Sequence, residues 1–172
     1  MNQARHRVGQ FFLYLSAQLT PEDEALVKSI LPPALLPLFR RQSAGEQKHS
    51  LKLARWLAKR EPGQAELLQA ALLHDVGKSV APINLLERVE AVLVRRLLPG
   101  PYARWAQAEP RGWRKPFVTA VNHPAWGADL AAQAGASPLV VSLIRRHQDL
   151  KRAPVTEEDR LLRLLQQSED QS

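Results

Sequence analysis

Residues 67–78, with the sequence LLQAALLHDVGK, decide the fold. Spacings of three, four and seven residues place His74 on one face of a helix with the apolar residues before it, and Asp75 on the adjacent face. An imidazole and a carboxylate at the buried end of so apolar a helix need partners, because an isolated buried charge is very costly. A divalent metal ion is the partner that would satisfy both side chains.

Helix boundary signals recur along the chain and predict an all-α protein, since no segment alternates apolar and polar residues for long. We expect the helix that carries His74 to begin at Glu61-Pro62 and to end at Gly77. Residues 99–116, rich in proline and arginine, are predicted to form a loop or a short-helix connection. Further helices are predicted to begin at Thr20-Pro21, Ser43-Ala44, Ser137-Pro138 and Thr156-Glu157.

Length and composition indicate one globular domain. The chain has 172 residues, of which 45% are hydrophobic and 24% are charged, as in an ordinary soluble protein. Because it has no cysteine, any metal ion must bind to His, Asp, Glu or Gln. The formal net charge of +7 favours polyanionic ligands, meaning nucleotides, nucleic acid or phosphate esters.

The sequence predicts neither a membrane span nor a membrane partner. The longest segment without a charged residue, residues 130–144, has 15 residues, whereas a transmembrane helix needs about 20. Near the N-terminus, residues 11–15 form a short apolar run that is bounded by the polar residues Gln10 and Ser16. We interpret this run as the first amphipathic helix of a cytoplasmic protein.

A second inward-facing histidine precedes the His74-Asp75 pair by 25 residues. Helical spacing places His49 on one face with Leu53, Trp56 and Leu57. The pattern of one histidine, a His-Asp pair and a later acid resembles the HD-domain superfamily of metal-dependent phosphohydrolases. The sequence His-Asp-x-Gly-Lys, followed by further histidines, is similar to the HDIG-type subgroup.

The resemblance implies an all-α HD-domain helical bundle with a metal site at its centre. It assigns residues 47–172 to the HD domain and residues 1–46 to an N-terminal helical lead-in packed on the same core. It also implies a cofactor of one or two divalent transition metal ions, Mn, Fe, Co, Ni or Zn, since imidazole and carboxylate ligands suit these ions.

The resemblance further implies which residues bind metal. Two elements would serve a second ion: His123 in a His-Pro-x-x-Gly sequence, and His147 where the subgroup often has a His-His pair. Gln148 departs from that pair. The closing acid is Glu169 by register, or Asp170 after a slip of one residue. The implied ligands are thus His49, His74, Asp75, His123, His147 and Glu169 or Asp170, with Asp75 bridging if two ions bind.

The implied function is hydrolysis of a phosphomonoester or phosphodiester by a metal-activated water. The substrate would be a phosphate-containing small molecule, a nucleotide or another phosphate ester. Asp75 and Lys78 would be catalytic, and Lys78, Arg145 and Arg146 would contact phosphate. The Gly-Tyr-Pro tripeptide of cyclic-dinucleotide hydrolases is missing, which disfavours that substrate.

Several alternatives stay open from the sequence alone. Lys78 can be a cation beyond a helix C-terminus, and Arg145 and Arg146 can form a solvated face. Gln148 and the ending Ser168-Glu169-Asp170 are compatible with a catalytically weak regulatory or nucleotide-binding module. A basic RNA-binding protein is a third hypothesis, in which Trp113 between arginines would stack on bases. The sequence does not predict the oligomeric state.

Overall fold

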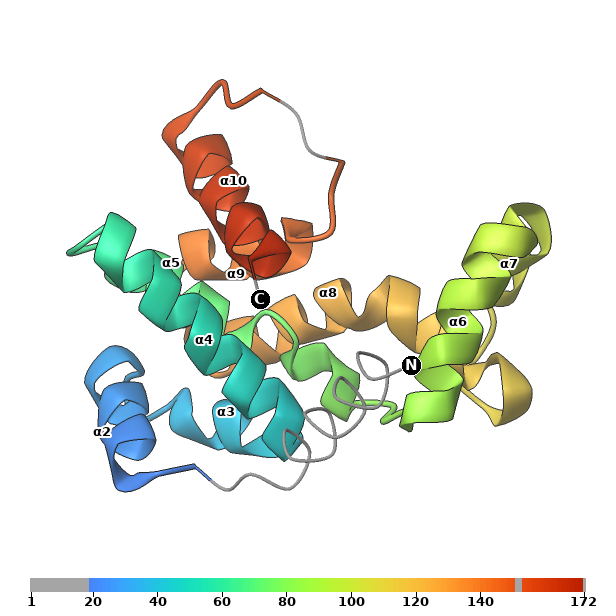
Figure 1. Ribbon diagram of the computed structural model, residues 1–172, viewed down its shortest axis with the longest axis horizontal. Coiled ribbons are helices and arrows are strands. Elements are labelled where there is room, and N and C mark those ends of the chain that lie inside the picture. The colour runs from blue at the N-terminus through green and yellow to red at the C-terminus, as the bar shows by residue number, and fades with distance from the viewer. Residues whose placement is uncertain (1–18, 151–152, 172) are drawn as a thin grey trace, which may run out of the picture.

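A computed structural model describes residues 19–150 and 153–171, and within these residues every regular element is a helix, as predicted (Figure 1). The expected amphipathic helix around residues 11–15 lies outside the described residues. The α-helices are α2 (Pro21–Ile30), α3 (Leu36–Arg41), α4 (Ala44–Arg60), α5 (Ala65–Leu73), α6 (Leu85–Leu97), α7 (Pro99–Trp105), α8 (Lys115–Gln133), α9 (Pro138–Arg146) and α10 (Glu157–Asp170). Two 3₁₀ helices are η1 (Val76–Ser79) and η2 (Gly112–Arg114).

Four of the predicted helix starts carry the expected caps, whereas the helix expected from Glu61-Pro62 begins at Ala65 without a side-chain cap. The side chains of Thr20, Ser43 and Thr156 each accept a hydrogen bond from the backbone N–H three residues later, and an acid at that position returns the contact. Ser137 caps α9 in the same way, without the returning acid. Sequence reasoning missed α6, although Asn84 and Glu87 form a capping box of the same kind at its start.

The end of α5 differs from the prediction, because this helix stops at Leu73 rather than at Gly77. Asp75 has φ −97° and ψ 2°, and the chain continues as η1. Two carbonyl groups near the end of α5 find partners in side chains. The Ala71 carbonyl accepts a hydrogen bond from the His74 ring, and the Leu72 carbonyl accepts one from the Gln42 side chain.

Close backbone packing between η1 and α8 explains why the chain leaves the helix before Gly77. A Cβ atom on Gly77 would lie 2.0 Å from the carbonyl oxygen of His123 and 2.6 Å from the backbone nitrogen of Gly127. Only glycine can occupy this position without displacing α8. The glycine of the His-Pro-x-x-Gly sequence faces it, because a Cβ on Gly127 would lie 3.1 Å from the Gly77 nitrogen.

One main core unites most of the helices. α4 packs on α5, α5 packs on α9, α8 packs on both α9 and η1, and α10 covers α4 and α9. Buried side chains of α2 and α3, including Val27 and Phe39, belong to the same core. The domain boundary expected near residue 47 stays a prediction. Four histidines border this core, His49 and His123 within α4 and α8 and His74 and His147 at the C-terminal ends of α5 and α9.

A second, smaller core supports α6 and α7, which stand at the opposite end of the molecule from α2 (Figure 1). It contains Ala91, Tyr102, Ala106 and Phe117. Residues 99–116, predicted as a loop or a short-helix connection, form α7 and η2. In residues 19–150 and 153–171, no helix is both long and apolar enough to cross a membrane.

We predict that Gly77→Ala destabilises the protein. The added methyl group would overlap the carbonyl oxygen of His123, so η1 and α8 must separate. Overpacking of this kind costs about 1–3 kcal/mol of unfolding free energy. Urea unfolding measures the change.

Gly100→Ala is the matched control, because a Cβ at Gly100 meets no atom within 4 Å. This variant should unfold at the wild-type urea concentration or slightly above it. Equal stability of Gly77→Ala and wild type would show that η1 and α8 are not in the contact described.

Candidate metal centre

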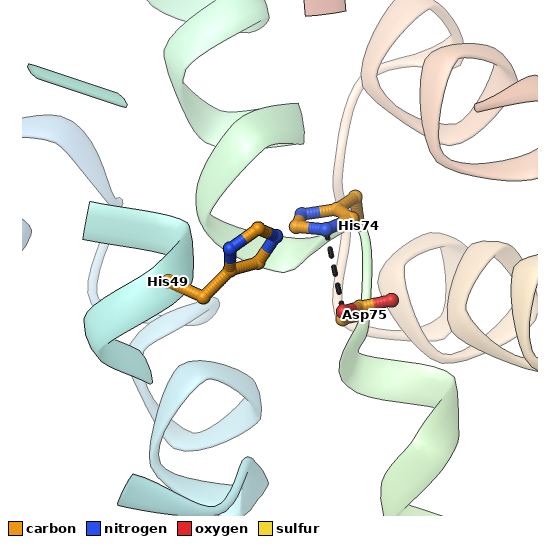
Figure 2. Close-up of side chains that lie close together, drawn as sticks. All are labelled: His49, His74 and Asp75. Carbon is orange, nitrogen blue, oxygen red and sulfur yellow. Dashed lines mark ion pairs between the residues drawn. The ribbon is translucent and has the colours of Figure 1, made fainter. Parts of the chain in front are cut away.

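Three side chains from two helices meet at the end of α5. His49 lies in the middle of α4, and His74 and Asp75 lie at the turn from α5 to η1. Figure 2 shows the His49 ring directed toward the His74 ring, with Asp75 beside His74. The two ring centroids are 5.5 Å apart, and His74 Nε2 lies 3.4 Å from Asp75 Oδ2. One ligand atom from each residue lies within 4.8 Å of the other two.

A second cluster uses the other oxygen of the same carboxylate. His123 Nε2 lies 3.3 Å from Asp75 Oδ1, and His147 Nε2 lies 4.0 Å from it. His123 comes from the middle of α8 and His147 from the C-terminal end of α9. All three side chains are buried, with 5% or less of each residue exposed. Asp75 is therefore shared between two groups of potential metal ligands.

The backbone sets the tautomer of three of these histidines. The Nδ1 atoms of His74, His123 and His147 lie 2.7–3.0 Å from the carbonyl oxygens of Ala71, Thr119 and Ile144. A carbonyl only accepts, so each Nδ1 carries the hydrogen. When such a ring is neutral, the lone pair of its Nε2 atom is therefore the one on the side of Asp75. A backbone-anchored imidazole of this kind is the usual form of a histidine metal ligand.

The two Nε2 atoms of His123 and His147 are only 3.3 Å apart. With both Nδ1 atoms protonated, two lone pairs face each other there, next to a carboxylate oxygen. No hydrogen bond between two neutral rings in these tautomers relieves that repulsion, whereas a cation among the three atoms does. The donor set therefore fits a divalent metal ion with nitrogen and oxygen ligands.

Burial and neighbouring charge shift the pKa values of the cluster. Burial, reinforced by the charge of His74, lowers the pKa of His49 to about 4 and that of His147 to about 3. Burial alone would raise the pKa of Asp75, but His74 and Lys78 hold it well below its usual value. Burial opposes charge on His74 too, yet the Asp75 carboxylate raises the His74 pKa above normal. At neutral pH His49 and His147 are thus unprotonated and Asp75 is ionised, as metal binding requires, and a bound ion would displace the proton that the raised pKa favours on His74.

Two polar side chains border the cluster. Lys78 Nζ lies 2.6 Å from Asp75 Oδ2, so its ammonium group contacts the shared carboxylate directly. Gln148 Nε2 lies 3.4 Å from His123 Nε2, at the place where the resemblance expected a second histidine. Both side chains also line a pocket of about 260 Å³ that extends from His123 toward α6 and α7.

Of the two closing acids, Glu169 is the one that the structure brings to the cluster. Its Oε1 atom lies 4.0 Å from His74 Nε2, and its side chain is 31% exposed. Asp170 is exposed. This placement agrees with the register expected from the sequence. The assignment of either acid as a ligand stays a prediction.

The structure does not bring Arg145 and Arg146 into the cluster. Arg145 pairs with Asp129 at 2.6 Å, and Arg146 contacts Glu158 at 2.6 Å and Asp159 at 2.7 Å. These ion pairs correspond to the solvated face that the sequence left open for the two arginines. Phosphate contact by Arg145 or Arg146 stays a prediction.

Sequence reasoning missed the basic residues that do line the pocket next to His123. Arg88 and Arg95 reach it from α6, and Tyr102 reaches it from α7. The spacing of residues 88, 91, 92 and 95 is that of one helical face, so the signal was present in the sequence. It was overlooked because the helix that carries it was not predicted.

Comparison with known proteins agrees with this arrangement. The family model described as HD domain matches residues 48–167, which include His49, His74, Asp75, His123 and His147. The chain belongs to the HD domain family. The HD fold is that of metal-dependent phosphohydrolases, and HD domains bind divalent metal ions. Glu169 and Asp170 lie just beyond the matched residues. No curated protein and no solved structure matches the chain.

The metal-free HD domain is expected to lose stability as the pH falls from 6.5 to about 4. His49 and His147 titrate at about 4 and about 3 in the folded protein and near 6.5 in the unfolded chain. Between pH 6.5 and about 4, the unfolded state binds more protons than the folded state. The stability that each group contributes above pH 6.5 is therefore lost on acidification, at up to about 1.4 kcal/mol per pH unit. Urea unfolding of chelator-treated protein across this range measures the slope.

The variant His49→Gln should show a shallower slope between pH 6.5 and 4 than wild type. Lys59→Gln, an exposed change on the same helix, should keep the wild-type slope. The raised pKa of His74 acts in the opposite sense, and its contribution is lost only as the pH rises above 6.5. The same slope in His49→Gln and wild type would contradict the buried, neutral state of His49.

Proposed function

We propose that this protein is a metal-dependent phosphohydrolase of the HDIG type, which hydrolyses a nucleotide or another phosphate ester. One observation supports this most strongly: the buried Asp75 carboxylate is shared by two groups of histidines, and the backbone orients the Nε2 atoms of His74, His123 and His147 toward it. The Nε2 atoms of His123 and His147 lie 3.3 Å apart beside this carboxylate, so one divalent cation would bind both rings and Asp75 together.

We assign one ion to His49, His74 and Asp75, with Glu169 completing the set from α10. A second ion would be held by Asp75, His123 and His147. Nitrogen-rich ligands of this kind favour Mn, Fe, Co, Ni or Zn over Mg, which prefers oxygen. A bound divalent ion supplies Lewis-acid activation of water and of a phosphoryl oxygen.

The residues of the chain itself prepare the site for an anionic substrate. Asp75 stays ionised because Lys78 and His74 surround it, so it can hold two cations without taking up a proton. The Lys78 ammonium group lies at the edge of the pocket beside His123, where it would contact a phosphate oxygen. The buried rings of His74, His123 and His147 keep their orientation because the backbone holds their Nδ1 atoms.

A catalytically weak nucleotide-binding or regulatory module is the alternative, and Gln148 is the observation that favours it. An amide next to His123 replaces an imidazole of the HDIG-type pattern. An amide oxygen binds transition metals less strongly than an imidazole nitrogen. In that case the protein would bind metal and a phosphate ligand but hydrolyse the ligand slowly or not at all.

We predict that Asp75→Asn loses bound metal and phosphohydrolase activity together. The amide keeps the shape of the side chain but removes the negative charge that both ligand groups share. Elemental analysis should show less than one ion per chain. Hydrolysis of p-nitrophenyl phosphate and bis(p-nitrophenyl) phosphate, with Mn²⁺ or Ni²⁺ supplied, should fall by more than about 100-fold.

Asp129→Asn is the matched control, because Asp129 is an exposed partner of Arg145. It should keep the metal content and activity of wild type. Wild-type protein that binds metal through Asp75 yet hydrolyses neither ester with any divalent ion would favour the regulatory alternative. Metal and activity retained in Asp75→Asn would contradict the site.

A further inference from the structure

The pocket beside the metal centre has two chemically different ends. Its inner end is formed by Lys78, His123 and Gln148, which border the Asp75 cluster. Its outer end is formed by α6 and α7. None of its described lining residues is acidic, although the chain contains 17 acidic residues. The charged side chains that line the pocket are therefore those of Lys78, Arg88 and Arg95, which are all basic.

One face of α6 supplies the outer wall. Residues Arg88, Ala91, Val92 and Arg95 follow the spacing i, i+3, i+4 and i+7, so their side chains lie on the same side of the helix. The side chains of Ala91 and Val92 give an apolar surface between two guanidinium groups. An organic group can pack on this surface while an anion binds at its end.

The two arginines of this face differ in whether an acidic side chain pairs with them. Arg88 donates to Glu46 at 2.5 Å, and Glu46 is buried, so the charge of Arg88 is compensated within the protein. Lys78 is likewise compensated by Asp75. Arg95 forms no side-chain hydrogen bond and no ion pair within residues 19–150 and 153–171. Tyr102, which is 7% exposed, lines the pocket next to it.

We propose that Arg95, on the α6 wall of the pocket, binds a second anionic group of the substrate. The inference rests on the proposed function, because the first anionic group is the phosphate that the metal centre would bind. The substrate class is thus a small phosphate ester that carries a second phosphate or carboxylate group. Its organic part would lie against Ala91 and Val92.

The size of the pocket further limits the class of substrate. Pockets for drug-sized ligands measure about 300–1,000 Å³, and this pocket is smaller, at about 260 Å³. It therefore suits one molecule smaller than a drug-sized ligand, which would contact both the metal centre and Arg95. A nucleic acid strand would have to lie outside it.

Alkane bisphosphonates of increasing chain length test this arrangement, because they cannot be hydrolysed and their spacers can lie on the apolar wall. Binding to the Mn²⁺-loaded protein is measured by calorimetry and compared with the alkyl monophosphonate of the same length. At one spacer length, the bisphosphonate should bind about tenfold to hundredfold more tightly, as expected for one charge-assisted contact.

The variant Arg95→Gln should remove that advantage and leave monophosphonate binding unchanged. Arg96→Gln is the matched control, since Arg96 is an exposed neighbour on α6 that does not line the pocket. It should keep the preference for the bisphosphonate. The proposal is overturned if no spacer length is preferred, or if Arg95→Gln and Arg96→Gln behave alike.

Hydrolysis of p-nitrophenyl phosphate by the same preparations separates this inference from the proposed function. If this ester is hydrolysed while the bisphosphonate advantage is missing, the role of Arg95 fails and the hydrolase assignment stands. If the ester is not hydrolysed but the advantage exists and depends on Arg95, the binding site stands and the hydrolase assignment fails.

Discussion

The contact between the backbones of η1 and α8 is the constraint on which the rest of the structure depends. Gly77 lies so close to the His123 carbonyl that no side chain fits between them. This contact carries Asp75, two residues earlier, into reach of the His123 ring at 3.3 Å. A larger residue at position 77 would move the carboxylate away from one of its two histidine groups. The geometry of the candidate metal centre is therefore set by a packing requirement outside it.

The ends of two helices connect the fold to the site. An α-helix leaves its last carbonyl groups without backbone donors. At the ends of α5 and α9 the rings of His74 and His147 donate to such carbonyls through Nδ1. The same hydrogen bond that completes the helix end directs Nε2 into the cluster. Folding and ligand orientation are thus achieved by the same contacts, with no cost in unpaired polar groups at these positions.

Much of this arrangement could be predicted from the sequence. Capping residues at Thr20, Ser43 and Thr156 predicted three helix starts, and helical spacing predicted that His49 and His74 face inward. These features depend on residues close together in the chain. The early end of α5 could not be predicted in this way, because it depends on the approach of α8, about 50 residues later. For the same reason, periodicity alone could not show that His123 and His147 meet.

The pocket beside His123 was the least predictable part of the structure. Its wall on α6 follows a simple helical spacing, but only the tertiary fold shows that this face turns toward His123. Arg145 and Arg146, which the sequence placed beside a histidine, instead pair with acids on α8 and α10 and at the start of the segment between α9 and α10. These ion pairs are those of the solvated face that the sequence also allowed, and phosphate contact by the two arginines stays a prediction, whereas Lys78 contacts Asp75 directly.

The central claim is that Asp75 and the histidines around it bind metal through the Nε2 atoms. Anomalous diffraction from crystals of the Mn²⁺- or Zn²⁺-loaded protein tests it most directly. The account predicts one or two anomalous peaks beside the Asp75 carboxylate, at about 2.0–2.3 Å from the nearest imidazole Nε2 atoms. Peaks confined to surface carboxylates, with no metal beside Asp75 in fully loaded protein, would contradict it.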